Sequence, residues 1–232
     1  MLRSPELPCA GRTVGVPLKV KGFIVGSVQL LAWAKENNCP WVVRVCKWAA
    51  RYGYMEALQW AREHGCPWEA KTCAGAARGG HLAMLKWARD HNCEWDVKTC
   101  AWAAKEGHLE MLQWARERHC PWDWMTCAVA AKNGHLELLK WALERGCPAG
   151  DGTLCLYASG GGQLEVLTWL REHDYPWDGA NLCAVAAQGG HLGTLKWLRE
   201  QGCAWDADTV QRATAAGHAD VLQWALDNGC PS

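Results

Sequence analysis

Tryptophan recurs along this chain at a nearly constant interval, and this spacing constrains the fold more than any other feature. Eight tryptophans are separated by 27, 27, 27, 27, 28, 28 and 27 residues: Trp33, Trp60, Trp87, Trp114, Trp141, Trp169, Trp197 and Trp224. Self-similarity at a period of roughly 20–50 residues is typical of stacked supersecondary units. Such a stack presents one long surface and seldom a catalytic pocket, so we expect a binding protein without enzymatic activity.

One period, KTCAWAAKEGHLEMLQWARERHCPWD at residues 98–123, predicts two helices and no strand. Its Ala-rich first segment ends at a glycine position, which suits a left-handed residue at a helix end. Asp96 or Thr99 can cap this segment. In the second segment apolar residues recur at helical spacing, and Cys120-Pro121-Trp122 stops it because proline cannot continue a helix. The glycine recurs in every period, at Gly26, Gly53, Gly80, Gly107, Gly134, Gly162, Gly190 and Gly217.

The strings AAKEGHLEMLQWA (103–115), AAKNGHLELLKWA (130–142) and AAQGGHLGTLKWL (186–198) resemble the ankyrin repeat, whose helices read roughly LHLAAxxGHLEVVKLL. Tryptophan stands at one of the core leucine positions of the second helix. The resemblance covers about residues 27–230. The Cys-Pro-Trp type is similar to ankyrin-like arrays of large DNA viruses of protists, and of algae and water moulds.

Two departures from the ankyrin pattern change what the resemblance implies. The Thr-Pro-Leu-His signature is absent, and the period falls short of the usual length of about 33 residues. The missing residues are those that form protruding β-hairpin fingers in ankyrin proteins. The resemblance therefore implies an all-α, ankyrin-like solenoid of about eight helix–turn–helix units with the fingers largely deleted, and it favours the first-helix face for binding.

The predicted domain organisation is a flexible N-terminal segment, residues 1–13, followed by a single repeat array, residues 14–232. The first unit, 14–42, is degenerate. The stretch near 148–162 is a soft unit, because it lacks the tryptophan after Pro148, has one extra residue and is rich in glycine.

The 14 cysteines raise the hypothesis of a zinc site, which two substitutions argue against. Tyr175 replaces one repeating cysteine while Cys183 remains, and Val210 replaces the other while Cys203 remains. A free cysteine behaves as a small buried hydrophobe, so we expect no metal, no disulfide and no cofactor. With no signal peptide and no apolar stretch long enough for a membrane, we expect a cytoplasmic protein, in the host cytoplasm if the source is viral.

We expect the eight periodic tryptophans to form the structural core, each packing against its own first helix and the next unit. A second tryptophan column follows each Cys-Pro pair, and we expect its indole N–H groups to bond to backbone. It comprises Trp41, Trp68, Trp95, Trp122, Trp177 and Trp205. A histidine column follows the repeating glycine, and the resemblance implies that it makes structural hydrogen bonds between neighbouring units.

One first-helix position varies in a way that is typical of a surface shaped to a ligand. It reads Trp48, Gly75, Trp102, Val129, Tyr157, Val185 and Arg212. A neighbouring column is basic in the N-terminal units. The candidate partner-binding residues are Trp48, Arg51, Arg78, Trp102, Lys105, Trp124, Lys132 and Tyr157. A solvated helix face, with an occasional tryptophan packed on the next unit, explains the same pattern.

These observations predict a non-catalytic protein–protein interaction module or scaffold that binds an unidentified protein on the concave face of its first helices. The alternative is nucleic-acid or other polyanion binding along an N-terminal Arg/Lys stripe. Residues 1–135 hold 18 Lys and Arg against 12 Asp and Glu, yet the whole chain has zero net charge, which argues against this alternative. The chain stops where the next tryptophan would stand, so we also expect weak end-to-end self-association.

Overall fold

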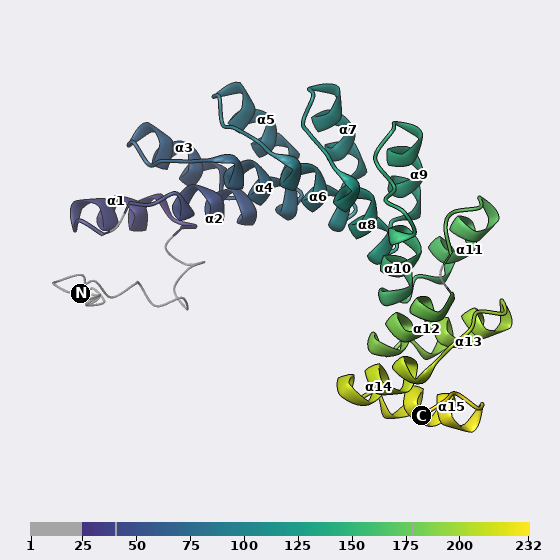
Figure 1. Ribbon diagram of the computed structural model, residues 1–232. Coiled ribbons are helices and arrows are strands. Elements are labelled where there is room, and N and C mark those ends of the chain that lie inside the picture. Colours follow the sequence, from purple (N-terminus) through teal and green to yellow (C-terminus); the bar gives the residue numbers. More distant parts are fainter. Residues whose placement is uncertain (1–24, 40, 178) are drawn as a thin grey trace. The chain divides into compact units, whose positions relative to one another are not determined.

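The structure is a computed structural model that describes residues 25–39, 41–177 and 179–232 (Figure 1). Within these residues the regular structure is entirely helical, with fifteen helices and no strand, as the sequence predicts. The expected flexible segment 1–13 and most of the first helix of the degenerate unit lie outside the described residues. The helices are α1 (Val28–Glu36), α2 (Arg44–Tyr52), α3 (Met55–Glu63), α4 (Ala70–Gly79), α5 (Leu82–Asp90), α6 (Val97–Lys105), α7 (Leu109–Glu117), α8 (Trp124–Lys132), α9 (Leu136–Glu144), α10 (Thr153–Gly160), α11 (Leu164–Glu172), α12 (Gly179–Gln188), α13 (Leu192–Glu200), α14 (Ala207–Ala216) and α15 (Ala219–Asp227).

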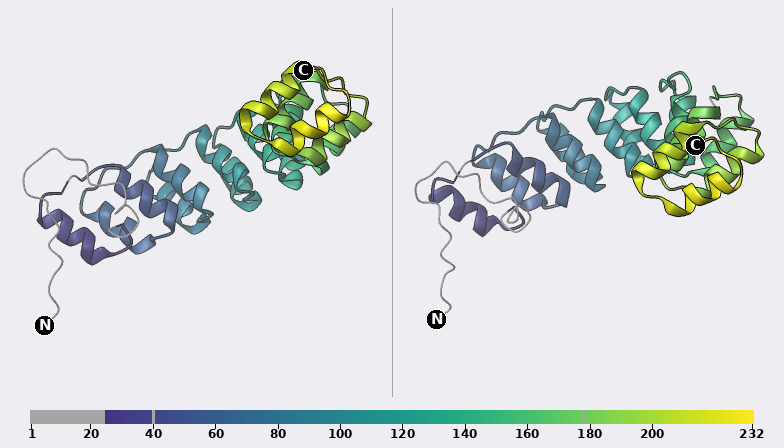
Figure 2. Two further views of the ribbon diagram at one scale, coloured as in Figure 1. Left: turned by 90° about the horizontal axis from the view of Figure 1, so that it is seen from below. Right: turned by 60° about the horizontal axis from the view of Figure 1, so that its bottom comes forward.

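The chain divides into two compact parts, an N-terminal part of residues 1–99 and a C-terminal part of residues 100–232. In the N-terminal part, α2 packs beside α4, and each forms a hairpin with the helix that follows it. In the C-terminal part, the first helices α8, α10, α12 and α14 pack in sequence order, and each again contacts its own second helix (Figure 1). Figure 2 shows the helices of residues 25–99 following one another in the same way. The prediction of one array over residues 14–232 stays a prediction.

Small residues fill the space between the first helices, and leucines of the second helices pack on them. In α4, Cys73, Ala76 and Ala77 are fully buried, and in α5 so is Leu85. A Cβ on Gly75 would lie 2.7 Å from the carbonyl oxygen of Lys47, so α4 approaches α2 too closely for a larger side chain there. The short, Ala-rich first segment is therefore what allows the helices to stack tightly.

The eight periodic tryptophans are half-buried, which corrects their expected place at the centre of the core. The fully buried positions belong instead to Leu, Ala and Cys, because these residues fit between helices while an indole extends past the second helix to its edge. The tryptophans concerned are Trp33, Trp60, Trp87, Trp114, Trp141, Trp169, Trp197 and Trp224.

The glycine and histidine columns meet at the junctions between repeats. Gly107 has a φ of 76°, and a Cβ there would lie 2.7 Å from the ring of His135. The Nε2–H group of His135 donates to the Lys105 carbonyl oxygen at 3.0 Å. His191 and His218 make equivalent bonds at 3.2 and 3.1 Å, which supports the expected structural role of the column. The left-handed conformation holds for every described member of the glycine column except Gly26.

Each second helix ends at a further left-handed residue that the sequence pattern did not reveal. Glycine fills this position in some repeats, at Gly65, Gly146, Gly202 and Gly229, and Asn38, Asn92, His119 and Asp174 fill it in others. Asparagine and aspartate tolerate this conformation better than most residues, and histidine is also enriched in it. The residue just before often bonds back to the helix, as His91 does through Nδ1 to the Trp87 carbonyl oxygen at 2.8 Å.

Aspartates begin several first helices. The Asp123 and Asp206 carboxylates accept hydrogen bonds from backbone N–H groups two residues later, each at 3.1 Å. Asp96 does the same for Lys98, so Asp96, and not Thr99, caps α6. These caps satisfy donors that the first helical turn leaves free.

Candidate partner-binding surfaces

The first surface lies on α2 in the N-terminal part. The rings of Trp48 and Tyr52 stack, with centroids 5.5 Å apart and planes 12° from parallel. The Tyr54 ring lies tilted beside the Tyr52 ring, with centroids 6.2 Å apart. The Arg51 guanidinium lies 5.3 Å from the Trp48 ring and 5.8 Å from the Tyr52 ring. Tyr52 is 45% exposed and Tyr54 37%. We call Trp48, Arg51, Tyr52 and Tyr54 the α2 patch.

The α2 patch is held in place by close packing around it. The Tyr52 ring contacts the rings of both Trp48 and Tyr54. The Arg51 guanidinium lies over the rings of Trp48 and Tyr52. Because few rotamers remain open to rings stacked in this way, the patch loses little conformational freedom when another surface covers it. It therefore has the composition and rigidity of a binding hot spot.

In the C-terminal part, two further aromatic contacts lie on first helices. The Lys105 ammonium lies 4.9 Å from the ring of Trp102 on α6. Trp124, the first residue of α8, is 40% exposed and meets Tyr157 of α10 edge to face at 6.2 Å. We call Trp124 and Tyr157 the α8–α10 pair.

The structure describes three contacts among the predicted site residues. Trp48 with Arg51, Trp102 with Lys105, and Trp124 with Tyr157 are brought together. Arg78 lies half-buried in the last turn of α4. Lys132 is exposed at the end of α8.

Tyr52 and Tyr54 were not among the predicted site residues. Their signal in the sequence was the cluster of three aromatic residues within seven positions, Trp48 to Tyr54. The prediction instead compared one position across repeats, and that comparison cannot detect a cluster formed within a single repeat.

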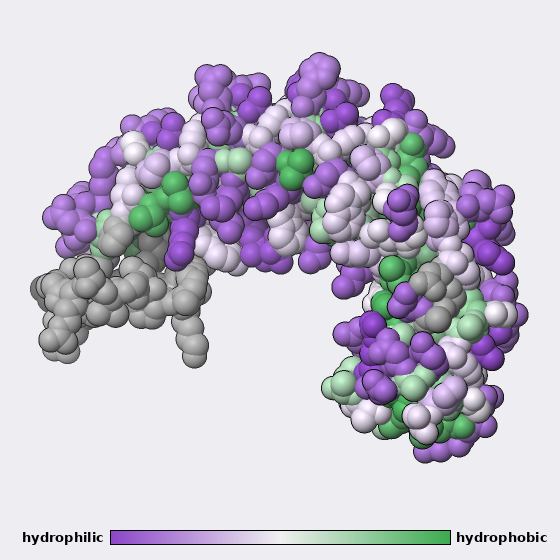
Figure 3. Space-filling model, viewed as in Figure 1, coloured by the Kyte–Doolittle hydropathy of each residue, from purple (hydrophilic) through white to green (hydrophobic). Residues whose placement is uncertain are grey.

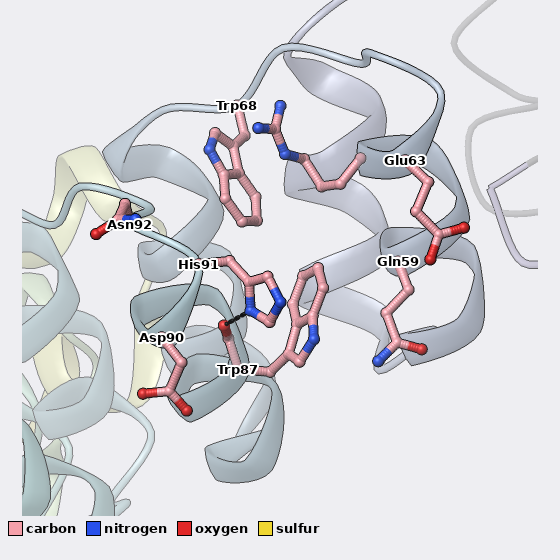
Figure 4. A pocket seen from close by; sticks show the side chains of 8 residues that line it. Gln59, Glu63, Trp68, Trp87, Asp90, His91 and Asn92 are labelled. Atoms are coloured by element: carbon pink, nitrogen blue, oxygen red, sulfur yellow. Dashed lines mark hydrogen bonds between the residues drawn. The ribbon is translucent and has the colours of Figure 1, made fainter.

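A second type of surface lies between consecutive second helices. Between α3 and α5 a groove with a volume of about 470 Å³ is lined by Gln59, Arg62, Glu63, Trp68, Trp87, Asp90, His91 and Asn92 (Figure 4). Trp68 and Trp87 meet edge to face at 5.8 Å, and the Trp87 ring lies 4.3 Å from the ring of His91. Around these rings the ends of the second helices are hydrophilic, as Figure 3 shows for α5 and, in the C-terminal part, for α7 and α9.

An arginine braces the loop that carries Trp68. The Arg62 guanidinium lies 4.1 Å from the Trp68 ring, and its Nη1 group also donates to the carbonyl oxygen of Cys66. Arg89 and Arg116 make the same two contacts to their own loops. The loop tryptophan is thus held between a guanidinium of its own repeat and an indole of the next.

The indole N–H groups of the loop tryptophans do not follow the expected pattern of backbone bonding. Nε1 of Trp177 donates to the Sγ atom of Cys203 at 3.0 Å. Nε1 of Trp41 is buried and has no partner among the described residues. Contacts between rings and a guanidinium fix these side chains, so their position does not depend on an N–H bond.

The C-terminal part contains the equivalent groove between α9 and α11. Its volume is about 800 Å³, and it is lined by Lys140, Leu143, Glu144, Trp169, His173, Asp174, Tyr175 and Pro176. The Trp169 ring stacks on His173 at 4.3 Å and meets Tyr175 at 5.7 Å. We call these two sites the α3–α5 groove and the α9–α11 groove.

In three repeats two cysteines 20 residues apart in the sequence contact each other. Cys46 hydrogen-bonds to Cys66 and Cys73 to Cys93, and in the C-terminal part Cys127 bonds to Cys147. In each pair the first thiol donates, which together with burial raises its pKa well above the usual range. All described cysteines are free thiols, and no group of three or more possible metal ligands occurs in the described part of the chain. Nearly all of these cysteines are buried and fill the core.

The comparisons with known proteins support the ankyrin repeat family. Residues 127–171 match the family model described as "Ankyrin repeats (many copies)". The chain is similar to the crystal structure of the human ASB11 ankyrin repeat domain, with 16% identity and a TM-score of 0.53, over 68% of this chain and 84% of that chain. No curated protein matches the chain. The structural likeness shows that the fold is an ankyrin-repeat solenoid, while the narrower resemblance to viral Cys-Pro-Trp arrays stays a prediction.

The fold found in this way is a known non-enzymatic interaction module, and ankyrin repeats generally mediate protein–protein interactions. None of the described helices is both long enough and apolar enough to cross a bilayer.

Proposed function

We propose that this chain is a non-catalytic interaction module that binds a partner protein on its first helices, the face that is concave in ankyrin solenoids. The α2 patch is the main anchor in the N-terminal part, and the α8–α10 pair is the anchor in the C-terminal part. The observation that carries the proposal is the cluster of half-buried Trp48 with exposed Tyr52 and Tyr54, in which Arg51 lies over the first two rings.

Aromatic and arginine side chains are the residues that contribute most to protein–protein binding energy, whereas Lys, Glu and Asp contribute least. An exposed aromatic stack also leaves apolar surface in contact with water, which a partner's surface removes. The basic residues at the patch suit a partner with an acidic surface, since opposite charges speed association and fix the orientation of the two proteins.

Nucleic-acid binding along the basic stripe is the alternative function. Two stripe cations, Arg51 and Lys105, lie over the rings of Trp48 and Trp102 and are therefore partly engaged within the protein. Binding that depended on phosphate contacts would weaken steeply as salt is raised. Binding through the aromatic patches is expected to change far less between about 50 and 200 mM salt.

The test is affinity purification from a nuclease-treated cytosolic lysate with the wild-type chain and two double variants. Trp48→Ala/Tyr52→Ala removes the α2 patch, and Trp124→Ala/Tyr157→Ala removes the α8–α10 pair. We expect each variant to recover at most about a tenth of the partner held by wild type, since loss of a hot-spot residue costs about 2 kcal/mol or more.

Leu164→Ala/Leu226→Ala is the matched control, because both leucines are exposed but lie on second helices. Circular dichroism establishes that each variant remains helical. Equal recovery by the patch variants and wild type would show that the partner does not use the first-helix surface. Recovery of nucleic acid alone, when nuclease is omitted, would favour the alternative function.

A further inference from the structure

Arginine and the loop tryptophan occur as a pair along the chain, six residues apart. The pairs are Arg62 with Trp68, Arg89 with Trp95, Arg116 with Trp122, Arg171 with Trp177, and Arg199 with Trp205, and each guanidinium lies 4.1–5.2 Å from its ring. Both members are replaced together in the last repeat, by Leu226 and Ser232, and in the repeat of α9, by Leu143 and Ala149. The joint replacement leaves the α9–α11 groove without the two side chains that fill the equivalent site elsewhere.

The missing tryptophan leaves Trp169 without its usual neighbour. In the other repeats the loop indole meets the next periodic tryptophan edge to face, at 5.8 Å for Trp68 with Trp87 and 6.0 Å for Trp122 with Trp141. Trp169 has ring contacts with His173 and Tyr175, which both come from its own repeat. Its side toward the preceding repeat faces the wider groove of about 800 Å³.

Carboxylates outnumber cations in both grooves, but only the α3–α5 groove has an arginine among its lining residues. In the α3–α5 groove Arg62 lies among the carboxylates of Glu63 and Asp90. In the α9–α11 groove the equivalent carboxylate Glu144 remains, Asp174 adds another, and Leu143 supplies no charge. The one ammonium there, on Lys140, pairs with Glu137 at 2.8 Å and lies 6.0 Å from the Trp169 ring. The α9–α11 groove thus combines a half-buried indole beside the Lys140 ammonium with two carboxylates, and no arginine is among its lining residues.

We propose that the α9–α11 groove is a docking site for a segment of a partner protein that presents a tryptophan beside an arginine. The partner's indole takes the place of the loop tryptophan against Trp169, and its guanidinium lies near Glu144 and Asp174. The partner in this way completes the pair that this repeat lacks. The proposal concerns a different face from the α2 patch and does not depend on the function proposed above.

The minimal probe is the blocked dipeptide Ac-Trp-Arg-NH₂, with Ac-Trp-Gln-NH₂ and Ac-Ala-Arg-NH₂ as matched controls. Binding to the full chain is followed by NMR through the indole N–H resonance of Trp169, assigned by its loss in Trp169→Phe. We expect a saturable shift with Ac-Trp-Arg-NH₂, about fivefold weaker binding of Ac-Trp-Gln-NH₂, and no shift with Ac-Ala-Arg-NH₂. The dissociation constant is expected in the millimolar range, as suits a ligand of this size.

Two variants change the groove in opposite ways. Leu143→Arg/Ala149→Trp restores the missing pair and is expected to abolish binding. Glu144→Gln/Asp174→Asn alters only exposed side chains, and asparagine tolerates the left-handed backbone of residue 174. It is expected to remove the preference for Ac-Trp-Arg-NH₂ over Ac-Trp-Gln-NH₂ while keeping the tryptophan-dependent shift.

Three results would overturn the proposal. These are the absence of a saturable shift at Trp169, full binding by Leu143→Arg/Ala149→Trp when that variant remains folded, and an unchanged arginine preference in Glu144→Gln/Asp174→Asn. A shift of Trp169 that grows with protein concentration, in the absence of peptide, would identify a second copy of this chain as the occupant and would likewise contradict it.

Discussion

Burial determines how two of the cysteines titrate, Cys155 and Cys183. Cys155 is 1% exposed, and burial raises its pKa from 9.0 to about 11. Burial likewise raises the pKa of Cys183 to about 12. Because thiolates, not thiols, react with alkylating agents and bind metals, these side chains remain inert near neutral pH in the folded protein.

The raised pKa of Cys155 predicts a loss of stability in alkali. Above pH 9 the thiol ionises in the unfolded chain but stays protonated in the folded one, so the free energy of unfolding falls until about pH 11. Urea unfolding of wild type and Cys155→Ala at several pH values measures this effect. We expect the stability difference between them to fall by roughly 2 kcal/mol over that window.

Other alkaline titrations occur in both proteins and cancel in this difference. A difference that stays constant from pH 9 to pH 11 would show that the Cys155 thiol is not buried in the way described.

The sequence predicted which cysteines are core residues but not which ones touch. The contacts join cysteines 20 residues apart, such as Cys73 and Cys93. Spacing along the chain identifies neighbours on one helix. The second helix folds back along the first and brings more distant residues together. Which residues meet depends on how the two helices pack, and sequence spacing does not specify that packing.

At the scale of the element, the loops between repeats are short and are held by side chains. The arginine in the last turn of a second helix binds the carbonyl oxygen of the following cysteine and covers the loop tryptophan, as Arg116 does for Cys120 and Trp122. A guanidinium can make a directional hydrogen bond and stack on a ring at the same time, which an ammonium group does less well.

We therefore expect Arg116 and Trp122 to be energetically coupled. Arg116→Gln is expected to lower the free energy of unfolding by about 1–2 kcal/mol, since a hydrogen bond to a charged donor and a cation–π contact are lost together. A double-mutant cycle with Trp122→Ala measures the coupling, which we expect to be about 0.5–1 kcal/mol.

Leu143→Gln serves as the reference for Arg116→Gln, because that repeat lacks both partners. Strictly additive effects of Arg116→Gln and Trp122→Ala would mean that the two side chains act independently.

Helix positions were predictable from local signals, while the grooves were not. Glycine, proline and apolar periodicity mark where each helix begins and ends, so the hairpins follow from the sequence. The α9–α11 groove depends on two replacements, Leu143 and Ala149. Their combined effect on the groove is apparent only in the structure, where Trp169 lines the same groove as Leu143. When each repeat position is compared separately, the missing tryptophan indicates only a soft unit.

At the scale of the whole molecule, the repeats within each of the two compact parts contact chiefly their neighbours, so stability is expected to accumulate from repeat to repeat within each part. The C-terminal part contains four complete hairpins from α8 to α15, with buried leucines in each second helix except α15, where Val221 and Ala225 are buried. We expect a fragment of residues 94–232, which begins just before the Asp96 cap of α6, to fold without the rest of the chain.

Circular dichroism and urea unfolding of this fragment test the prediction. We expect a helical spectrum and a cooperative transition. A fragment that is largely unstructured, or that unfolds without cooperativity, would show that the C-terminal part needs residues before 94 for its stability.

Most repeats carry both halves of a junction, a glycine that accepts the following ring and a histidine that reaches back to the preceding repeat, as at Gly107 and His135. Gln163 takes the place of the histidine opposite Gly134. A gene segment that encodes one repeat can therefore be duplicated or deleted and still produce matching surfaces on either side. Arrays of this type can change length during evolution without new interfaces. A new binding preference then needs only a few altered side chains within a single copy, as the replacements at 143 and 149 illustrate.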